Sequence, residues 1–168
     1  MRTRITQRFA KASISLITAL LIFAPVSTIH GDEASHVSAM VAELVESTNT
    51  ERLALGLDAL ERNTVLNRAA QMKADDMAAN GYFSHTSPNN MEPWDWMDRA
   101  GYAYIAAGEN LAVNFMSPDK TVGAWMESPS HRANIEKGKY TEIGTGVAFG
   151  MYKGREAAFV VQMYAKPR

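Results

Sequence analysis

The chain has 168 residues, a formal net charge of −1 and no cysteine. This length suits one domain with a single hydrophobic core, so a two-domain arrangement is unnecessary. The absence of cysteine excludes disulfides and thiolate chemistry, and the core alone must hold the fold. Without the four basic residues of positions 1–31, the 17 basic residues fall to 13 against 18 acidic ones, and this net charge of −5 does not favour binding to nucleic acid or to an anionic membrane.

The N-terminus has the pattern of a secretory signal peptide. Four basic residues within positions 1–11 precede the uncharged run ISLITALLIFAPV, which is shorter than the roughly 20 residues of a membrane-spanning helix. Cleavage is expected near Gly31, so that residues 32–168 form the mature domain, with no stable transmembrane span. An uncleaved N-terminal anchor is the alternative, because Ile29 stands where a small residue usually precedes the cleavage point. A secreted or periplasmic protein is expected.

Three helical patterns follow in the mature region. Apolar residues recur at helical spacing from about Val37 until Gly56 ends the pattern, and they recur again over about 65–80, before an Asn-Gly pair. The next segment, YFSHTSPNNMEPWDWM, is rich in serine, proline and asparagine. It predicts a loop that leads to a short helix over about 93–100.

Two prolines define further helix ends. Ser117 and Pro118 predict an N-cap and a first helical position, and this helix reaches about Glu127. The residue before a proline is driven out of the α region, so the helix should end near Ser128. We expect Ser128 to cap a new turn that begins at Pro129.

The hydrophobic period changes at the C-terminus. Residues 143–150 and 157–165 are rich in β-branched and aromatic residues, and the hairpin-like link MYKGRE separates them. The sequence therefore predicts an α+β domain, in which several helices precede a small antiparallel sheet.

Two histidines and two glutamates are the candidate site. His85 lies in the hydroxyl-rich loop FSHTSP and His131 follows Pro129, but a single such histidine is more often structural or simply exposed. Glu109 lies in an apolar stretch, where it must be exposed, paired, or engaged in pinning a loop. Glu127 could simply end a helix. Together, two imidazoles and two carboxylates are sufficient to hold a divalent ion such as Zn²⁺.

Other catalytic classes find little support. The chain lacks HExxH, GxSxG, P-loop and GxGxxG motifs. Serines adjacent to histidine in SPSH do not establish the geometry of a nucleophile and its base, so a serine hydrolase is disfavoured. Two glutamates could form a glycosidase pair, but nothing in the sequence fixes their separation.

Five motifs in order resemble the CAP superfamily of cysteine-rich secretory, antigen 5 and pathogenesis-related 1 proteins, in its bacterial cysteine-free branch. They are TNTERLALGLDAL, FSHTSP, GENLA, WMESPSHRANI and YTEIGTGVAF, over about residues 40–165. The resemblance implies a three-layer α-β-α sandwich with an open cleft, lined by two histidines and two glutamates that bind a divalent metal in several members. By motif, this tetrad is His85, Glu109, Glu127 and His131. Polar neighbours are expected around the ligands at Ser84, Asn110 and Arg132.

The resemblance favours binding over catalysis, because the family is known for binding and effector roles without a settled common activity. We expect a secreted or periplasmic protein whose cleft binds a divalent cation, with zinc as one candidate, and a lipid, sterol or peptide ligand. One alternative is a metal-dependent hydrolase with Glu109 or Glu127 as general base. Another is an interaction module for a host or envelope protein. Neither the natural ligand nor the oligomeric state follows from the sequence.

Overall fold

The computed structural model describes residues 27–114 and 117–168, so most of the predicted signal peptide lies outside the described residues. The elements in chain order are α1 (Ser27–Ala54), β1 (Glu61–Arg62), α2 (Thr64–Asn80), α3 (Pro93–Ala100), β2 (Tyr104–Val113), α4 (Pro118–Glu127), α5 (Pro129–Ile135), β3 (Glu142–Tyr152) and β4 (Arg155–Pro167). Within these ranges, each helix is too short or too polar to cross a lipid bilayer.

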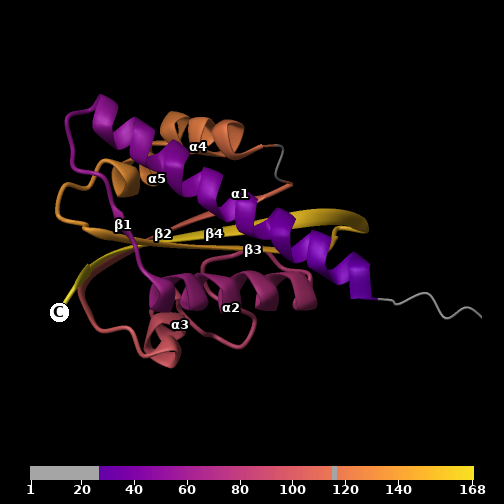
Figure 1. Ribbon diagram of the computed structural model, residues 1–168. Coiled ribbons are helices and arrows are strands. Elements are labelled where there is room, and N and C mark those ends of the chain that lie inside the picture. Colours follow the sequence, from indigo (N-terminus) through magenta and orange to yellow (C-terminus); the bar gives the residue numbers. More distant parts are fainter. Residues whose placement is uncertain (1–26, 115–116) are drawn as a thin grey trace, which may run out of the picture.

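A four-stranded sheet in the order β1-β3-β4-β2 divides the molecule into layers. Helices α2 and α3 cover one face, and α1, α4 and α5 cover the other (Figure 1). The predicted three-layer sandwich is therefore confirmed. The sheet is mixed instead of purely antiparallel, because β1 pairs with β3 in parallel while β4 pairs antiparallel with both β3 and β2.

The two predicted C-terminal strands are confirmed as β3 and β4, joined by a two-residue turn. Lys153 and Gly154 have φ values of 50° and 79°, and Tyr152 pairs with Arg155 across the turn. Positive φ at both turn residues is the type I′ geometry, whose twist matches that of the flanking strands.

Helix α2 packs very closely on β3. A Cβ at Gly144 would lie 2.2 Å from the carbonyl carbon of Leu66, and one at Gly146 would lie 2.4 Å from the amide nitrogen of Gln71. Any larger residue at these positions would push the helix off the sheet. The glycines of the IGTGVAFG motif are therefore explained by helix packing.

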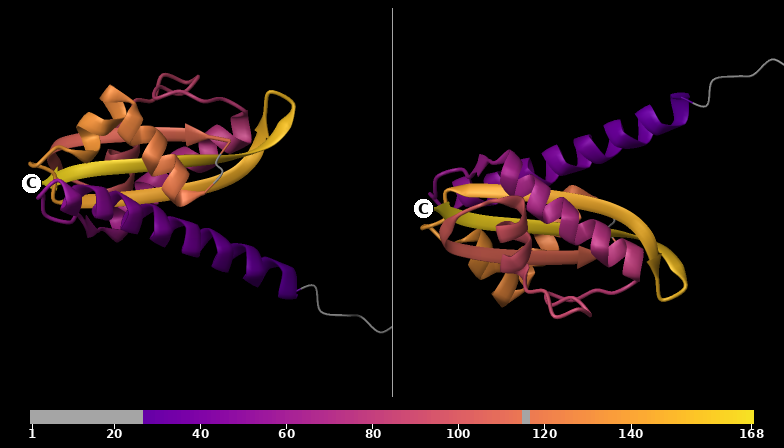
Figure 2. Two further views of the ribbon diagram at one scale, coloured as in Figure 1. Left: turned by 90° about the horizontal axis from the view of Figure 1, so that it is seen from above. Right: turned by 90° about the horizontal axis from the view of Figure 1, so that it is seen from below.

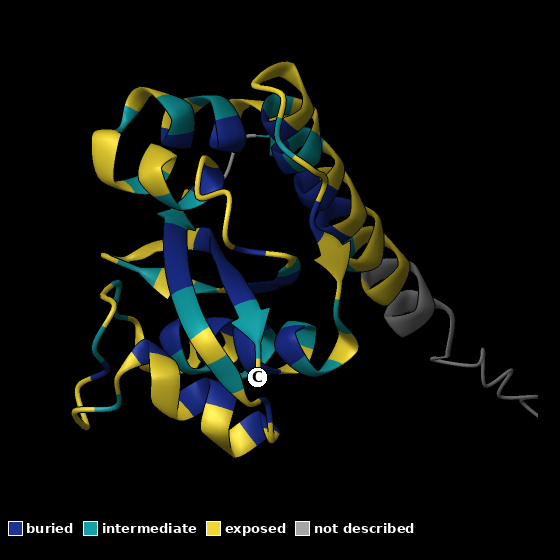
Figure 3. Ribbon diagram, turned by 90° about the vertical axis from the view of Figure 1, so that its left-hand side faces the viewer, coloured by how far each residue is buried: buried dark blue, intermediate teal, exposed yellow. Residues whose placement is uncertain are grey.

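The sheet separates two hydrophobic cores. Along β4, Phe159 and Val161 pack on the α2 side, whereas Val160 and Tyr164 pack beneath α1 and α4. Figure 3 shows the buried residues on the strands and on the inner faces of the helices. This alternation is the period of two expected for a strand buried on both sides.

The helix predictions agree with the structure at most ends. Asn63 caps α2 by accepting hydrogen bonds from the next turn, Gly81 ends it in the left-handed conformation, and α3 and α4 lie where expected. Helix α1 begins earlier than the predicted Val37, at Ser27, and its N-terminal part extends away from the sandwich in both views of Figure 2. The predicted cleavage point near Gly31 lies within the start of this helix.

Strand β2 was not predicted from the sequence. It forms one edge of the sheet and pairs along its length with β4, from Tyr104 opposite Pro167 to Val113 opposite Phe159. Glu109 and Asn110 are consequently strand residues and do not belong to a loop.

Candidate functional site

Edge strand β2 sends alternate side chains to the two layers of helices. Asn110 lies opposite Gln162 and shares the α1 face with it, so Glu109 points to the α2 face. Because β2 is an edge strand, groups from both layers can meet around its open side. The candidate site lies at this edge.

Glu109 and His85 form the central contact of the site. The Nδ1 atom of His85 lies 2.6 Å from Oε1 of Glu109, and it is the donor because a carboxylate only accepts. The imidazole is 56% exposed, whereas the carboxylate side chain is 2% exposed. The second carboxylate oxygen, Oε2, is buried without a hydrogen-bond partner among the described residues. An orphaned oxygen of this kind is rare in proteins and calls for a ligand, a proton or water.

The two groups alter each other's protonation. Burial raises the pKa of Glu109, and the hydrogen bond from His85 partly opposes that rise. The same hydrogen bond raises the pKa of His85 above its ordinary value, against a smaller opposing effect of burial. The pair therefore retains a proton more readily than either group would in water.

His131 approaches the same edge from α5. Ser128 occupies the predicted N-cap position of α5, but its hydroxyl makes no hydrogen bond to the helix backbone. The hydroxyl instead lies 2.9 Å from Nδ1 of His131. Burial lowers the pKa of His131, and the charge of nearby His85 lowers it further. In both histidines Nδ1 is engaged, and Nε2 is the nitrogen left for a ligand.

Two asparagines join α5 to β2. The amide of Asn110 donates to the carbonyl of His131 and to the hydroxyl of Tyr164, each at 3.1 Å. The amide of Asn134 donates to the carbonyl of Glu109 at 3.0 Å and to Oδ1 of Asn110 at 2.9 Å. The backbone of His131 is thereby fixed relative to the strand that carries Glu109.

Side chains also cover the open edge of β2. Beside the Asn134 contact, the hydroxyl of Tyr140 donates to the carbonyl of Ala107 at 2.7 Å, and the indole of Trp125 donates to that of Leu111 at 3.0 Å. Three alternate carbonyls of the edge thus have side-chain donors. This arrangement hinders pairing with another strand, which is a common hazard of exposed edges.

A largely apolar cavity of about 510 Å³ opens next to His131. Its wall comes from the loop after α2, from the end of β2 and from α4, and includes Phe83, Leu111, Val113, Ala124 and Trp125. Ser128 and His131 also line it, so polar groups of the site border an apolar space. Ligand sites commonly combine these two features.

The structure brings together part of the predicted tetrad. His85 and Glu109 are in contact, and His131 lies near enough for the charge of His85 to affect its pKa. Glu127 is exposed at the end of α4 and makes no hydrogen bond or ion pair within the described part of the chain. Among the side chains that the structure describes, those of residues 34–114 and 117–168, no three from His, Cys, Asp or Glu cluster closely enough to hold a metal ion. The four-ligand metal site remains a prediction.

The predicted polar neighbours have different environments. Asn110 is buried and bonded as described, whereas Ser84 is exposed and Arg132 lies on the surface, 3.4 Å from Glu136.

Three relevant residues were not assigned to the site from the sequence: Lys73, Ser128 and Asn134. Of these three, the sequence could have indicated Lys73, because a lysine is unusual on the apolar stripe of the predicted helix over 65–80.

Relatives were found by sequence. Residues 45–164 match the CAP family, described as the cysteine-rich secretory protein family. The uncharacterized protein YkwD of Bacillus subtilis is 42% identical over 112 residues, which are 67% of this chain and 44% of YkwD. The uncharacterized membrane protein YlbC of the same organism is 31% identical over 105 residues, or 62% of this chain and 30% of YlbC. The chain thus spans less than half the length of these two relatives.

Solved structures show the same fold. An extracellular protein of Bacillus anthracis that contains an SCP domain has a TM-score of 0.69 and 24% identity, over 85% of this chain and 45% of that one. An outer surface protein of Borrelia burgdorferi has a TM-score of 0.63 and 23% identity, over 74% and 90% of the two chains. A cysteine-rich secretory protein of Staphylococcus aureus has a TM-score of 0.60 and 19% identity, over 84% and 40%.

Proposed function

The chain belongs to the CAP family, and we propose that it is an exported protein that binds a divalent cation and an apolar ligand at the open edge of β2. Export is supported by the N-terminal signal pattern and by the extracellular or surface proteins that share its fold. The proposed site consists of three residues, His85, Glu109 and His131, whereas Glu127, the fourth ligand predicted from the sequence, is exposed at the end of α4.

One observation carries the cation proposal: the buried carboxylate of Glu109 has one oxygen on His85 and the other without a partner in the described chain. A buried, unpaired carboxylate oxygen is costly, and a bound cation would remove that cost. Glu109 also orients the imidazole so that Nε2 of His85 is available, as carboxylates commonly do for metal-ligating histidines. His131 would supply a second Nε2.

The candidate ligand atoms are of the kinds that zinc binds. Imidazole nitrogens and carboxylate oxygens are common Zn²⁺ ligands, whereas Ca²⁺ and Mg²⁺ prefer oxygen alone. A bound ion would supply a positive charge able to attract or polarise the polar end of a ligand. The adjoining cavity of about 510 Å³ is lined mainly by apolar side chains and would accept the apolar part of a lipid, sterol or peptide.

A metal-dependent hydrolase is the second candidate. Its general base would be Glu109 or Glu127, and burial raises the pKa of Glu109, which favours uptake of a proton by that carboxylate. In that case, turnover of an ester or peptide library should disappear when a chelator is added. A protein-interaction module would instead still bind its partner protein after the site residues are mutated.

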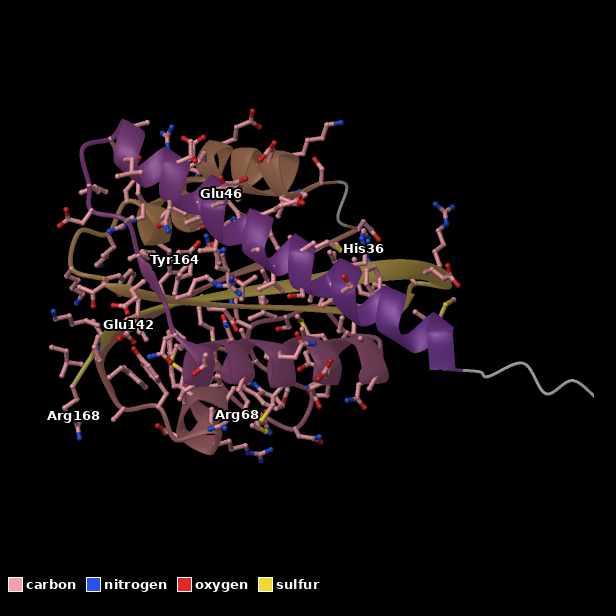
Figure 4. The ribbon with its side chains drawn as sticks, in the orientation of Figure 1. His36, Glu46, Arg68, Glu142, Tyr164 and Arg168 are labelled. Atoms are coloured by element: carbon pink, nitrogen blue, oxygen red, sulfur yellow. The ribbon has the colours of Figure 1, made fainter. Side chains whose placement is uncertain are left out.

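Calorimetric titration of Zn²⁺ into the exported protein tests the cation proposal. His85→Ala and His131→Ala should each remove most of the binding, because each deletes one imidazole ligand. His36→Ala is the matched control, since His36 is an exposed histidine on the N-terminal half of α1 (Figure 4). Equal binding by the wild type and His131→Ala would show that the ion, if bound, is held elsewhere.

A further inference from the structure

Lys73 is a fully buried lysine in the middle of α2, with 0% of its surface exposed. Its ammonium donates to the carbonyl oxygen of His85 at 2.7 Å and to the hydroxyl of Tyr82 at 3.2 Å. That hydroxyl in turn donates to Oδ2 of Asp76 at 2.6 Å. A chain of hydrogen bonds therefore runs from α2 to the backbone of the candidate ligand His85.

Neighbouring groups offset part of the cost of burying this ammonium. The ammonium lies 5.1 Å from the ring centre of Tyr82 and 5.9 Å from that of Trp96, which is within the range of cation–π attraction. Burial lowers the pKa of Lys73, and the nearby carboxylates of Glu109 and Asp76 oppose that effect. An apolar side chain would avoid the cost of burying an ammonium, but it could not hold a carbonyl.

The contact with Lys73 is the one that holds the backbone of His85 itself to α2, whereas Tyr82 attaches the start of the same loop through Asp76. Between α2 and α3 the chain forms no helix or strand, and its other backbone hydrogen bonds include a local turn between Ser87 and Met91. The imidazole of His85 is more than half exposed, so packing of the ring does little to fix its direction. The carbonyl of the same residue is instead held from beneath by Lys73.

We propose that Lys73 is a positioning residue, which holds the backbone of His85 so that its imidazole meets Glu109 and presents Nε2 at the edge of β2. This positioning requires no bound ion, so it can be tested without one. Its consequence for cation binding rests on the proposed function.

Lys73→Met tests this role, because methionine fills a similar space but cannot donate to the carbonyl. The exposed Lys139, changed to Met, is the matched control. The metal-free readout is the NMR signal of the Nδ1 proton of His85, which a 2.6 Å hydrogen bond to Glu109 should move far downfield. We expect the signal in the wild type and in Lys139→Met, and we expect it to be lost or broadened in Lys73→Met.

Zinc titration of the same proteins gives a second readout. Loss of a group that orients a ligand typically lowers metal affinity by roughly tenfold to a hundredfold, and that is the change expected for Lys73→Met. A folded Lys73→Met protein with the wild-type signal and the wild-type affinity would overturn the proposal. If the signal depends on Lys73 but no variant binds zinc, positioning is supported and the cation proposal fails.

A milder variant covers the case in which Lys73→Met does not fold. Tyr82→Phe keeps the ring over the ammonium but removes the hydroxyl that accepts from Lys73 and donates to Asp76. The ammonium is then held less firmly, so the His85 signal should broaden while the rest of the spectrum stays that of the folded domain. An unchanged His85 signal in Tyr82→Phe would count against the proposal.

Discussion

Gly108 lies directly beneath the side chain of Asn134. A Cβ at position 108 would lie 2.6 Å from Oδ1 of Asn134 and 2.8 Å from the hydroxyl of Tyr140, closer than real contacts of a Cβ. Glycine thus allows α5 to approach β2, so that the amide of Asn134 reaches the carbonyl of Glu109 at 3.0 Å. This close approach brings His131 to the strand of Glu109.

The first prediction changes this contact. Gly108→Ala should force Asn134 away and destabilise the domain by about 1–3 kcal/mol, the usual cost of overpacking a core. It should also weaken zinc binding, because His131 moves with α5. Gly123→Ala is the control, since a Cβ there meets nothing within 4 Å in helix α4, and it should be neutral or stabilising. Urea unfolding measures the stability of both variants. Equal midpoints for Gly108→Ala and the wild type would contradict the packing account.

The second prediction concerns the two histidines in the metal-free protein. The hydrogen bond to Glu109 raises the pKa of His85 above its ordinary value of 6.5, whereas burial lowers that of His131 below it. NMR titration should therefore place the two midpoints on opposite sides of 6.5. Glu109→Gln should lower the midpoint of His85, because the amide lacks the negative charge. Coincident midpoints in the wild type would show that the His85–Glu109 contact does not form in solution.

A third prediction follows for pH-dependent binding. A histidine must be deprotonated to bind a cation, and the raised pKa of His85 keeps its proton to higher pH. Zinc affinity should therefore fall as the pH falls, and the loss should begin above the ordinary histidine pKa of 6.5. His131, whose pKa is lowered, limits binding only at more acid pH. Calorimetry over about pH 5–8 measures this dependence. A zinc affinity that does not change over that range would exclude histidine ligation.

Much of the fold was predictable because its signals are local. The cap at Ser117, the end of α2 before Gly81 and the break at Pro129 depend on neighbouring residues alone. Strand β2 gave no comparable signal. Its sequence, YIAAGENLAV, is rich in small residues, and what makes it a strand is its pairing with β4 and the close approach of α5 over Gly108.

The site was predictable by residue type but not by arrangement. The contact between His85 and Glu109 connects a loop to an edge strand that the sequence did not reveal. The roles of Lys73 and Asn134 depend on distances between elements, which no spacing along the chain encodes. Glu127 was predicted as a ligand from the family motif alone. Its exposed position results from its place at the end of α4, which the motif does not encode.

A fourth prediction addresses the fold that supports the site. Arg52 is buried, with 1% of its surface exposed. It donates to the carbonyls of Asp58 at 2.9 Å, Ile135 at 2.6 Å and Lys137 at 3.2 Å. It therefore ties α1 to the end of α5. Arg52→Met leaves these carbonyls without their donor and should destabilise the domain by about 2–4 kcal/mol. The exposed Arg155, changed to Met, should alter the unfolding midpoint little, and similar midpoints for both variants would contradict this role.

The last prediction compares two adjacent residues with different expected roles in the site. The hydroxyl of Ser128 lies 2.9 Å from Nδ1 of His131 and orients the ring, so Ser128→Ala should lower zinc affinity by roughly tenfold. Glu127 is exposed and has no hydrogen bond or ion pair in the described structure, so Glu127→Ala should change the affinity less. Both changes lie at the junction of α4 and α5, so unfolding curves serve as the common control for damage to the fold. A larger loss of affinity in Glu127→Ala would mean that its carboxylate turns inward to bind the ion, and the four-ligand site predicted from the sequence would then replace the three-residue arrangement.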